Sequence, residues 1–233
     1  MRFALAVCVA CLASPAISEG VAAARYEEPT TRYAHGVLGD AIEHGALVME
    51  TATGRTVRVR LPESRVFEDT APRVFDVDGD GDGEVIVVES DMSLGARIAV
   101  YDADGLVAAN DFIGRTNRWL APVGIGAADL DGDGFVEIAF VDRPHLAKTL
   151  RIFRFANDGL TLVGEFPGVT NHRIGERDIA GGIRTCAGVP EMIVANAAWR
   201  RVLALRFDGS GFSSTDLGPH QGRESFAAAM TCS

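Results

Sequence analysis

The chain has 233 residues and a formal net charge of −10, and it is 47% hydrophobic but only 7% aromatic. This length and apolar content allow one domain with a substantial core. The 26 glycines favour many short strands and tight turns over long helices, and the acidic balance argues against nucleic acid or an anionic membrane surface as the main partner.

Residues 1–18 have the features of a secretory signal peptide. The basic Arg2 precedes an apolar run, and small residues follow at Ala16 and Ser18. The run is too short to span a bilayer as a folded helix, so we predict a signal that is cleaved after Ser18, with cleavage after Ala16 as the alternative. A lipoprotein signal fits less well, because the residues before Cys11 are a poor lipobox. No later segment is long and apolar enough to cross a membrane, so we expect an exported protein, either periplasmic or secreted.

A sequence repeat organises residues 37–233, after a lead-in at 19–36. Each copy contains three short β-branched or alternating runs that end in turn signals such as Asp-Gly. Acidic residues recur between strands at intervals of 53 and 54 residues, at Glu84, Glu137 and Glu191. We therefore predict a single repeat domain of about four copies, which span approximately 37–70, 71–119, 120–170 and 171–219.

The expected strands follow the same order in every copy. The three main runs occupy 45–51, 56–62 and 64–69 in the first copy, 83–90, 97–105 and 106–112 in the second, 136–142, 150–159 and 160–166 in the third, and 191–197, 202–211 and 212–218 in the fourth. In the last three copies another short strand precedes these runs, at 72–78, 124–131 and 172–179. The prediction is an all-β fold with almost no helix.

Four-stranded antiparallel units at a period near 50 are typical of β-propeller blades. A blade cannot bury both of its faces alone, so neighbouring blades stack and supply the core. The C-terminal segment 224–233 aligns with the first strand of a unit. We therefore predict a propeller-like fold in which this terminal strand closes the ring against the first blade. An open, curved stack of four sheets also satisfies the repeats.

Two loops between predicted strands are strongly acidic, DVDGDGDGE at 76–84 and DLDGDGFVE at 129–137. Aspartates at positions 1, 3 and 5 of such a loop repel one another unless a cation lies between them. Calcium accepts six to eight oxygen ligands with flexible geometry, whereas magnesium requires an octahedral shell and retains its waters. We therefore predict two calcium ions, one in each loop. The candidate ligands are Asp76, Asp78, Asp80, the carbonyl group of Asp82 and Glu84 in the first loop, and Asp129, Asp131, Asp133, the carbonyl group of Phe135 and Glu137 in the second.

The two loops differ from an EF-hand and resemble the calcium loops of FG-GAP and VCBS repeats. An EF-hand loop needs a glutamate at position 12 and a helix on each side, but position 12 is Val87 in one loop and Phe140 in the other. An acid at position 9 that enters a strand is similar to the repeats of integrin α-subunit propellers. The resemblance covers 72–166 well, is weaker over 176–218 and is faint over 37–69. It implies a calcium-binding β-propeller, and an acidic glycine-rich turn without metal is the alternative.

The corresponding loop of the fourth copy departs from this pattern. The segment from Asp178 to Glu191 keeps acids at its two ends, lacks the middle carboxylates and is longer. It contains Cys186, and Cys232 aligns with the second aspartate of the motif. With the signal removed, these two cysteines form an even pair in an oxidising compartment. We predict a disulfide that fastens the end of the chain where calcium fastens the other copies; two buried free thiols are the alternative.

The earliest loop retains only Asp40 and Glu43 of the acidic pattern, and we expect no metal there. No motif in the sequence indicates catalysis. The five histidines show no metal or triad spacing, and the chain has no nucleophile elbow, zinc-protease motif or phosphate loop. We therefore assign no catalytic residue. A pair of carboxylates suited to glycoside chemistry cannot be located from sequence, so an enzyme remains an alternative.

The leading functional interpretation is an exported calcium-binding module that binds or adheres to a protein or glycan partner. A carbohydrate-active or other hydrolytic enzyme on a propeller scaffold is the second interpretation, and a purely structural exported protein is the third. The connections before the third and fourth copies contain Arg115, Asn117, Arg118, Trp119 and the segment 171–173. These residues could gather on one face, or Trp119 could simply pack between blades. Neither the ligand nor the oligomeric state follows from the sequence.

Overall fold

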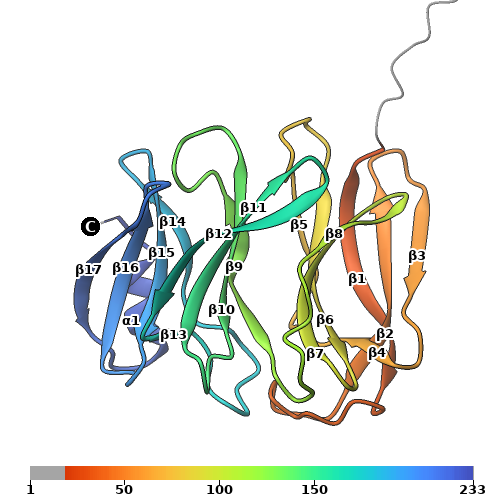
Figure 1. Cartoon of the computed structure of the whole chain (residues 1–233), viewed down its shortest axis with the longest axis horizontal. Coiled ribbons are helices and arrows are strands. Elements are labelled where there is room, and N and C mark those ends of the chain that lie inside the picture. Colours follow the sequence, from red (N-terminus) through yellow and green to blue (C-terminus); the bar gives the residue numbers. More distant parts are fainter. Residues whose placement is uncertain (1–18, 233) are drawn as a thin grey trace, which may run out of the picture.

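The computed structural model describes residues 19–232, and the predicted signal peptide lies outside this part of the chain. The described residues form 17 strands and one short helix, which confirms the all-β prediction. Figure 1 shows the strands as four blades that stand side by side in an open row. No helix among the described residues is long and apolar enough to cross a membrane.

The strands pair into three antiparallel sheets, and the first sheet contains two blades. Blade 1 is formed by β1 (Val21–Thr30), β2 (Glu43–Thr51) and β3 (Thr56–Arg60). Blade 2 is formed by β4 (Arg65–Phe67), β5 (Arg73–Phe75), β6 (Glu84–Asp91), β7 (Gly95–Asp102) and β8 (Gly105–Ala109). The short β4 pairs with both β2 and β6, and this links the two blades.

The other two sheets are one blade each. Blade 3 is formed by β9 (Leu120–Ala128), β10 (Val136–Asp142), β11 (Thr149–Ala156) and β12 (Gly159–Pro167). Blade 4 is formed by β13 (Val169–Thr170), β14 (Gly182–Cys186), β15 (Val189–Asn196), β16 (Arg201–Phe207) and β17 (Phe212–Pro219). In blade 3 each strand is hydrogen-bonded to the next, and in blade 4 β13 and β14 both pair with β15, which continues to β16 and β17.

The first blade starts earlier than predicted. The lead-in at 19–36 contains β1, which pairs with the whole length of β2, while the run at 64–69 is not an outer strand of blade 1 but contributes β4 to blade 2. The reason is burial: Tyr26 stacks on Phe67 with ring centroids 5.3 Å apart, so β1 and β4 cover the same core. The faint repeat signal in this region did not show that β1 supplies the missing strand.

The prediction of a strand at 172–179 is wrong. Residues 171–181 form an irregular segment between β13 and β14. These two short strands both pair with β15 and take the place of the first strand of blade 4. Gly175 and Gly181 have positive φ values of 86° and 82° within this segment, and glycine adopts such values without steric cost. The added Cβ at Gly181 would meet the carbonyl oxygen of Ile193 at 1.9 Å, so only glycine fits beside β15.

The prediction of a closing strand at 224–233 is also wrong. The segment contains helix α1 (Arg223–Ala229), which buries Phe226 and Ala229 against the outer face of blade 4. An alanine-rich segment has high helix propensity, and its apolar residues at helical spacing cover Ile193 and Val202 of the last sheet. Blade 1 and blade 4 lie at opposite ends of the row, so the structure corresponds to the open stack and not to a closed ring (Figure 1).

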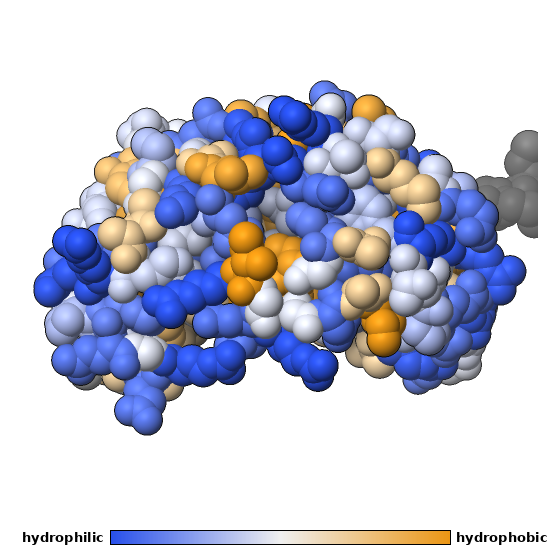
Figure 2. Space-filling view, turned by 90° about the horizontal axis from the view of Figure 1, so that it is seen from below, coloured by the Kyte–Doolittle hydropathy of each residue, from blue (hydrophilic) through white to orange (hydrophobic). Residues whose placement is uncertain are grey.

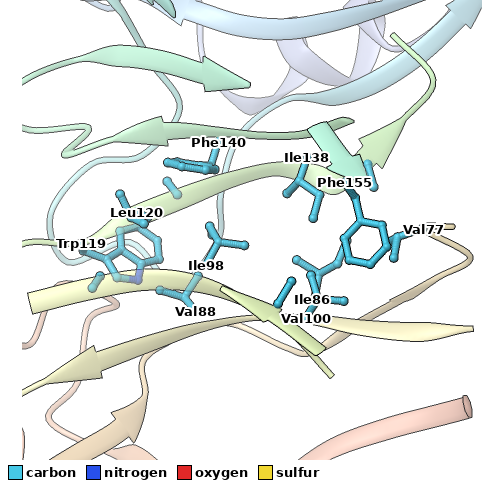
Figure 3. Close-up of a cluster of buried hydrophobic side chains, with 14 of the residues drawn as sticks. Val77, Ile86, Val88, Ile98, Val100, Trp119, Leu120, Ile138, Phe140 and Phe155 are labelled. Atoms are coloured by element: carbon cyan, nitrogen blue, oxygen red, sulfur yellow. The ribbon is translucent and has the colours of Figure 1, made fainter. Parts of the chain in front are cut away.

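The hydrophobic core lies between neighbouring blades. Figure 3 shows Val88 and Ile98 of blade 2 facing Leu120, Ile138 and Phe140 of blade 3. A second cluster joins blades 3 and 4, and a third joins blades 1 and 2. Complete burial of one such side chain contributes about 1.5–3 kcal/mol, so each blade depends on its neighbours for stability.

Candidate metal centres and a pocket at the opposite end

The two acidic loops lie at the same end of neighbouring blades, which we call the upper end. Residues 76–83 connect β5 to β6, and residues 129–135 connect β9 to β10. Both loops stand at the top of the molecule in the orientation of Figure 1. The strand-to-strand position that the sequence predicted for them is therefore confirmed.

Backbone amides hold the first loop around one carboxylate. Asp76 accepts hydrogen bonds from the amides of Gly79 at 2.7 Å and Gly81 at 3.1 Å, and both glycines have positive φ values. Glu84 closes the loop by accepting from the Val77 amide at 2.8 Å. The backbone of the loop is thus folded around the Asp76 carboxylate and closed by Glu84.

The second loop repeats this geometry contact for contact. Asp129 accepts from the amides of Gly132 at 2.7 Å and Gly134 at 3.1 Å. Glu137 accepts from the Leu130 amide at 2.9 Å. Because the same residue types make the same bonds at the same spacing, the two loops are structural copies as well as sequence copies.

Each loop brings three of its predicted ligands together. In the first loop, carboxylate oxygens of Asp76, Asp78 and Glu84 lie within 4.8 Å of one another, and in the second loop the same holds for Asp129, Asp131 and Glu137. The structure therefore contains two acidic triads that could bind metal ions such as calcium. The remaining predicted ligands lie outside the triads: Asp80 accepts from the Asp82 amide at 2.8 Å, and Asp133 accepts from the Phe135 amide at 3.0 Å.

The first loop carries uncompensated negative charge. Burial, with smaller contributions from the charges of Asp78, Asp80 and Asp76, raises the pKa of Glu84 to about 7, although the hydrogen bond from Val77 lowers it. Burial also raises the pKa of Asp78. No basic side chain between residues 19 and 232 forms an ion pair with a carboxylate of this loop. A bound cation would remove this repulsion.

The second loop contains a basic side chain that the sequence analysis missed. Arg154 of β11 forms ion pairs with Asp131 at 2.6 Å, Asp133 at 2.8 Å and Glu137 at 2.7 Å. Burial raises the pKa of Glu137, while its bonds from Leu130 and Arg154 lower it. The signal that could have located Arg154 is its cross-strand register with Glu137.

In blade 4 the predicted loop from Asp178 to Glu191 does not exist as one loop. It is divided by β14, and only the tight turn Ala187–Gly188 separates β14 from β15. Asp178 pairs with Arg223 instead. Glu191 pairs with Arg184 at 2.6 Å and Arg206 at 2.7 Å; burial opposes these bonds, but together they lower the pKa of Glu191.

The structure contains the predicted disulfide between Cys186 and Cys232. It joins the end of β14 to the residues after α1, across 46 positions of the chain. Disulfides persist in oxidising compartments, so the bond suggests an extracytoplasmic location. The end of the chain is thus fastened to blade 4, although by a helix and not by the expected strand.

A pocket of about 230 Å³ lies at the lower end of the molecule, opposite the acidic loops. It is formed where loops of three blades meet, and Figure 2 views this end and shows hydrophobic residues near its middle. Leu146 and Ile174 are 62% and 71% exposed there. The lining residues are His35, Asn117, Arg118, Trp119, Arg143, His145, Leu146 and Ile174.

Trp119 has the packing role that was the alternative interpretation. Its side chain is 2% exposed, and its indole N–H donates to the Glu68 carbonyl at 2.7 Å. The ring of His172 packs against it with centroids 4.8 Å apart. Asn117, Arg118 and Trp119 itself line the pocket, whereas Arg115 and residues 171–173 do not, so only part of the predicted set contributes to this site.

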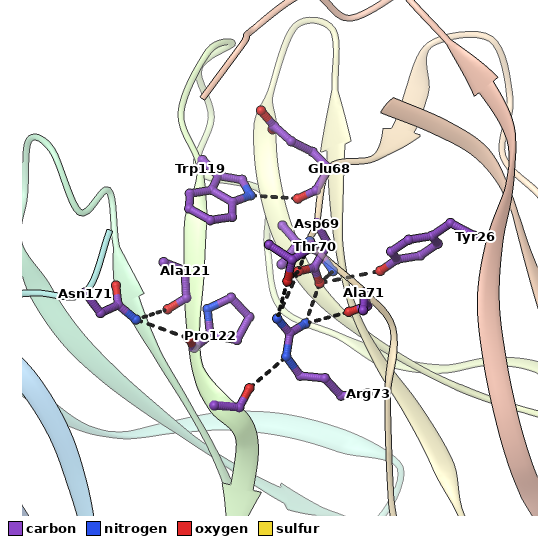
Figure 4. Close-up of polar contacts among 12 residues, drawn as sticks. Tyr26, Glu68, Asp69, Thr70, Ala71, Arg73, Trp119, Ala121, Pro122 and Asn171 are labelled. Carbon is purple, nitrogen blue, oxygen red and sulfur yellow. Dashed lines mark hydrogen bonds and ion pairs between the residues drawn. The ribbon is translucent and has the colours of Figure 1, made fainter. Parts of the chain in front are cut away.

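Polar contacts fasten the blades together beneath the pocket. Arg73 binds Asp69 at 2.6 Å and donates to the Gly124 carbonyl at 2.8 Å, which ties blade 2 to blade 3. Asn171 donates to the carbonyls of Ala121 and Pro122, both at 3.1 Å, which ties blade 4 to blade 3. Figure 4 shows both sets of contacts beside Trp119. These contacts join blades 2, 3 and 4 next to Trp119, one of the residues that line the pocket.

Two histidines near the pocket contact each other, although they are 27 residues apart in the sequence. His145 and His172 lie 3.1 Å apart, from Nε2 to Nδ1, and His172 also contacts the Glu176 carbonyl at 2.9 Å. Burial and, to a smaller extent, the neighbouring His172 lower the pKa of His145 to about 4. Both rings are therefore neutral at neutral pH; His145 lines the pocket, and the buried His172 lies behind it.

The comparisons with known proteins are sparse. No protein-family model matches the sequence, and no curated protein matches it. Among solved structures, the fold is similar to that of an exotype rhamnogalacturonan lyase, YesX, with a TM-score of 0.46 and 15% sequence identity. The match covers 79% of this chain and 43% of that chain, so this chain spans less than half of that structure. A likeness this distant carries no argument about activity or substrate.

Proposed function

We propose that this protein is an exported calcium-binding repeat module of the FG-GAP/VCBS type that binds a protein or glycan partner. The loop at 76–84 is the observation that carries the proposal. It gathers Asp76, Asp78 and Glu84 within 4.8 Å, and none of its carboxylates forms an ion pair within the described chain. A hard divalent cation with oxygen ligands suits this arrangement, and calcium suits a short flexible loop better than magnesium does.

The ion would act on stability by connecting two strands. Asp76 directly follows β5 and Glu84 begins β6, so one ion held by both residues would fasten the two strands where the loop joins them. A ligand that binds only the folded chain stabilises it by mass action, by about 2.7 kcal/mol at a hundredfold excess over the dissociation constant. The module would thus be rigid where calcium is abundant, as it is outside the cytoplasm.

Thermal unfolding tests the metal assignment. We expect a chelator to lower the melting temperature and calcium to restore it, because the repulsion among the loop carboxylates returns when the ion leaves. The double variant Asp78→Ala, Asp131→Ala should melt at the same temperature with and without calcium. A wild-type melting temperature that is indifferent to both chelator and calcium would show that the loops do not bind the ion, and magnesium in place of calcium tests selectivity.

The lower-end pocket is the candidate surface for the partner. It combines exposed apolar side chains, Leu146 and Ile174, with the guanidinium of Arg118, which forms no ion pair with an acid between residues 19 and 232. Arg143, in contrast, is paired with Asp142 at 2.7 Å. A concave site with an apolar wall and a few polar groups suits a small ligand or one sugar unit of a glycan.

A glycan array, together with generic hydrolase assays, tests the partner assignment. We expect the mature protein to retain a subset of glycans and Arg118→Ala to weaken this binding at least several-fold, because one charged hydrogen bond is lost. Arg115→Ala is the matched control, since Arg115 does not line the pocket. Equal binding by wild type and Arg118→Ala would remove the pocket from the proposal, and turnover of a bound glycan would instead favour the carbohydrate-active alternative.

A further inference from the structure

The two acidic loops differ at one cross-strand position. In blade 3 the strand register pairs Glu137 with Arg154. In blade 2 the register that pairs Val85 with Tyr101 places Asp102 opposite Glu84. The two loops are otherwise matched bond for bond, so this position is where their charge diverges most.

Arg154 is inserted among the carboxylates of its loop. Its guanidinium contacts Asp131, Asp133 and Glu137 at 2.6–2.8 Å, and the side chains of Asp131 and Glu137 are only 5% and 0% exposed. The ring centroid of Phe135 lies 5.7 Å from the guanidinium carbon. A guanidinium in this position satisfies two members of the acidic triad, Asp131 and Glu137, without an ion.

Asp102 cannot play the same role in blade 2. It is itself acidic, and its carboxylate is occupied by the backbone amides of Asp104 at 2.7 Å and Gly105 at 2.8 Å, in the turn that joins β7 to β8. The first loop therefore has no internal cation among the described residues.

Blade 4 completes the series. Its register pairs Met192 with Leu205, which places Arg206 opposite Glu191, and Arg184 contacts the same glutamate from β14. Here two arginines surround the acid and the acidic loop has been reduced to a tight turn. Among the described residues, Glu84 thus has no arginine partner, Glu137 has one and Glu191 has two.

We propose that Arg154 is a built-in counter-ion that makes the 129–137 loop a much weaker calcium site than the 76–84 loop. This inference rests on the proposed function. An ion that enters the second loop must displace the guanidinium from Asp131 and Glu137 or share their oxygens with it, and two cations in one small site repel each other. At low calcium one loop is occupied by the ion and the other is held by Arg154. The second loop fills only when calcium is high.

Calorimetric titration of calcium into the chelator-treated mature protein tests the proposal. We expect one tight site and a second site that is weaker by about tenfold or more, since displacing one charge-assisted hydrogen bond has at least this effect. Arg154→Gln should tighten the weak site by a similar factor and leave the tight site unchanged. Arg206→Gln is the matched control, because it removes the equivalent arginine from a blade without an acidic loop, and both sites should stay as in the wild type.

Two further variants keep the test independent of any folding defect in Arg154→Gln. In Asp78→Ala only the second loop keeps its full set of ligands, and in Asp131→Ala only the first loop does. The calcium dissociation constants of these two variants should therefore differ by the same factor as those of the two wild-type sites. Two wild-type sites of equal affinity, or an Arg154→Gln protein with unchanged affinities, would overturn the role of Arg154 while the calcium assignment stands. Absence of calcium binding in every variant would overturn both proposals.

Discussion

Glu43 begins β2 and is 2% exposed. Burial and, to a smaller extent, the nearby carboxylates of Glu68, Asp40 and Asp69 raise its pKa to about 9. Between its ordinary value of 4.5 and this raised value, the folded chain holds a proton that the unfolded chain has lost. Stability therefore falls as pH rises through this window; the cost is absent below pH 4.5 and complete near pH 9.

We predict that Glu43→Gln flattens this dependence. A single group of this kind changes the free energy of unfolding by about 1.4 kcal/mol per pH unit at most, and the neutral glutamine has no proton to lose. Urea unfolding at pH 5, 7 and 9 measures the free energy of unfolding of both proteins. In the difference between wild type and variant, the titration of all other groups cancels. Parallel curves for the wild type and the variant would contradict the burial of a protonated Glu43.

At the scale of strands and loops, the same hairpin is closed in three ways. In blade 2 the loop between its first two strands is acidic and without a basic partner, in blade 3 an arginine enters it, and in blade 4 it is a tight turn next to a disulfide. An arginine in blade 3 and a disulfide in blade 4 thus lie at strand ends equivalent to those where blade 2 has its acidic triad, the proposed ion site. The variation is possible because the strands around them keep the same register.

The disulfide gives the prediction at this scale. Reduction, or the paired change Cys186→Ser with Cys232→Ser, should lower the free energy of unfolding by about 2–4 kcal/mol, because the bond restricts the unfolded chain and secures α1. Denaturant unfolding with and without reductant measures this. The double serine variant should not respond to reductant. If reductant lowered the stability of both proteins equally, its effect would not come from this disulfide.

At the scale of the whole molecule, the open row of blades requires a cover at each end. Repeat proteins need terminal units with polar or covered outer faces. At one end α1 covers apolar residues of blade 4. At the other end an Arg–Glu network on β1, β2 and β3 covers the outer face of blade 1, with Arg25 paired to Glu50 at 2.6 Å and Arg58 paired to Glu27.

Surface ion pairs of this kind contribute little to stability, but they keep the terminal sheet charged and discourage association with other strands. The two covers explain how four blades can be stable without closing a ring. They also leave the two ends with the candidate sites free, with the acidic loops at the upper end and the pocket at the lower end (Figure 1).

Local patterns in the sequence were sufficient for the parts of this protein that depend on neighbouring residues. Alternating apolar residues identified the main strands, and glycine spacing identified the two acidic loops, because strand faces and turn geometry are determined within a few residues. The pairing of Cys186 with Cys232 also followed from the sequence, since removal of the signal leaves only these two cysteines.

Only the tertiary structure decided the features that depend on contacts across the chain. The α1 segment reads locally as a strand or a helix, and burial against blade 4 selects the helix. Arg154 reaches the acidic loop through a cross-strand register, and the pocket assembles loops that lie more than a hundred residues apart, from His35 to Ile174. The sequence by itself determined where charge and turns occur; the packing of the blades determined which charges are compensated, because an ion pair depends on distance in space and not on distance along the chain.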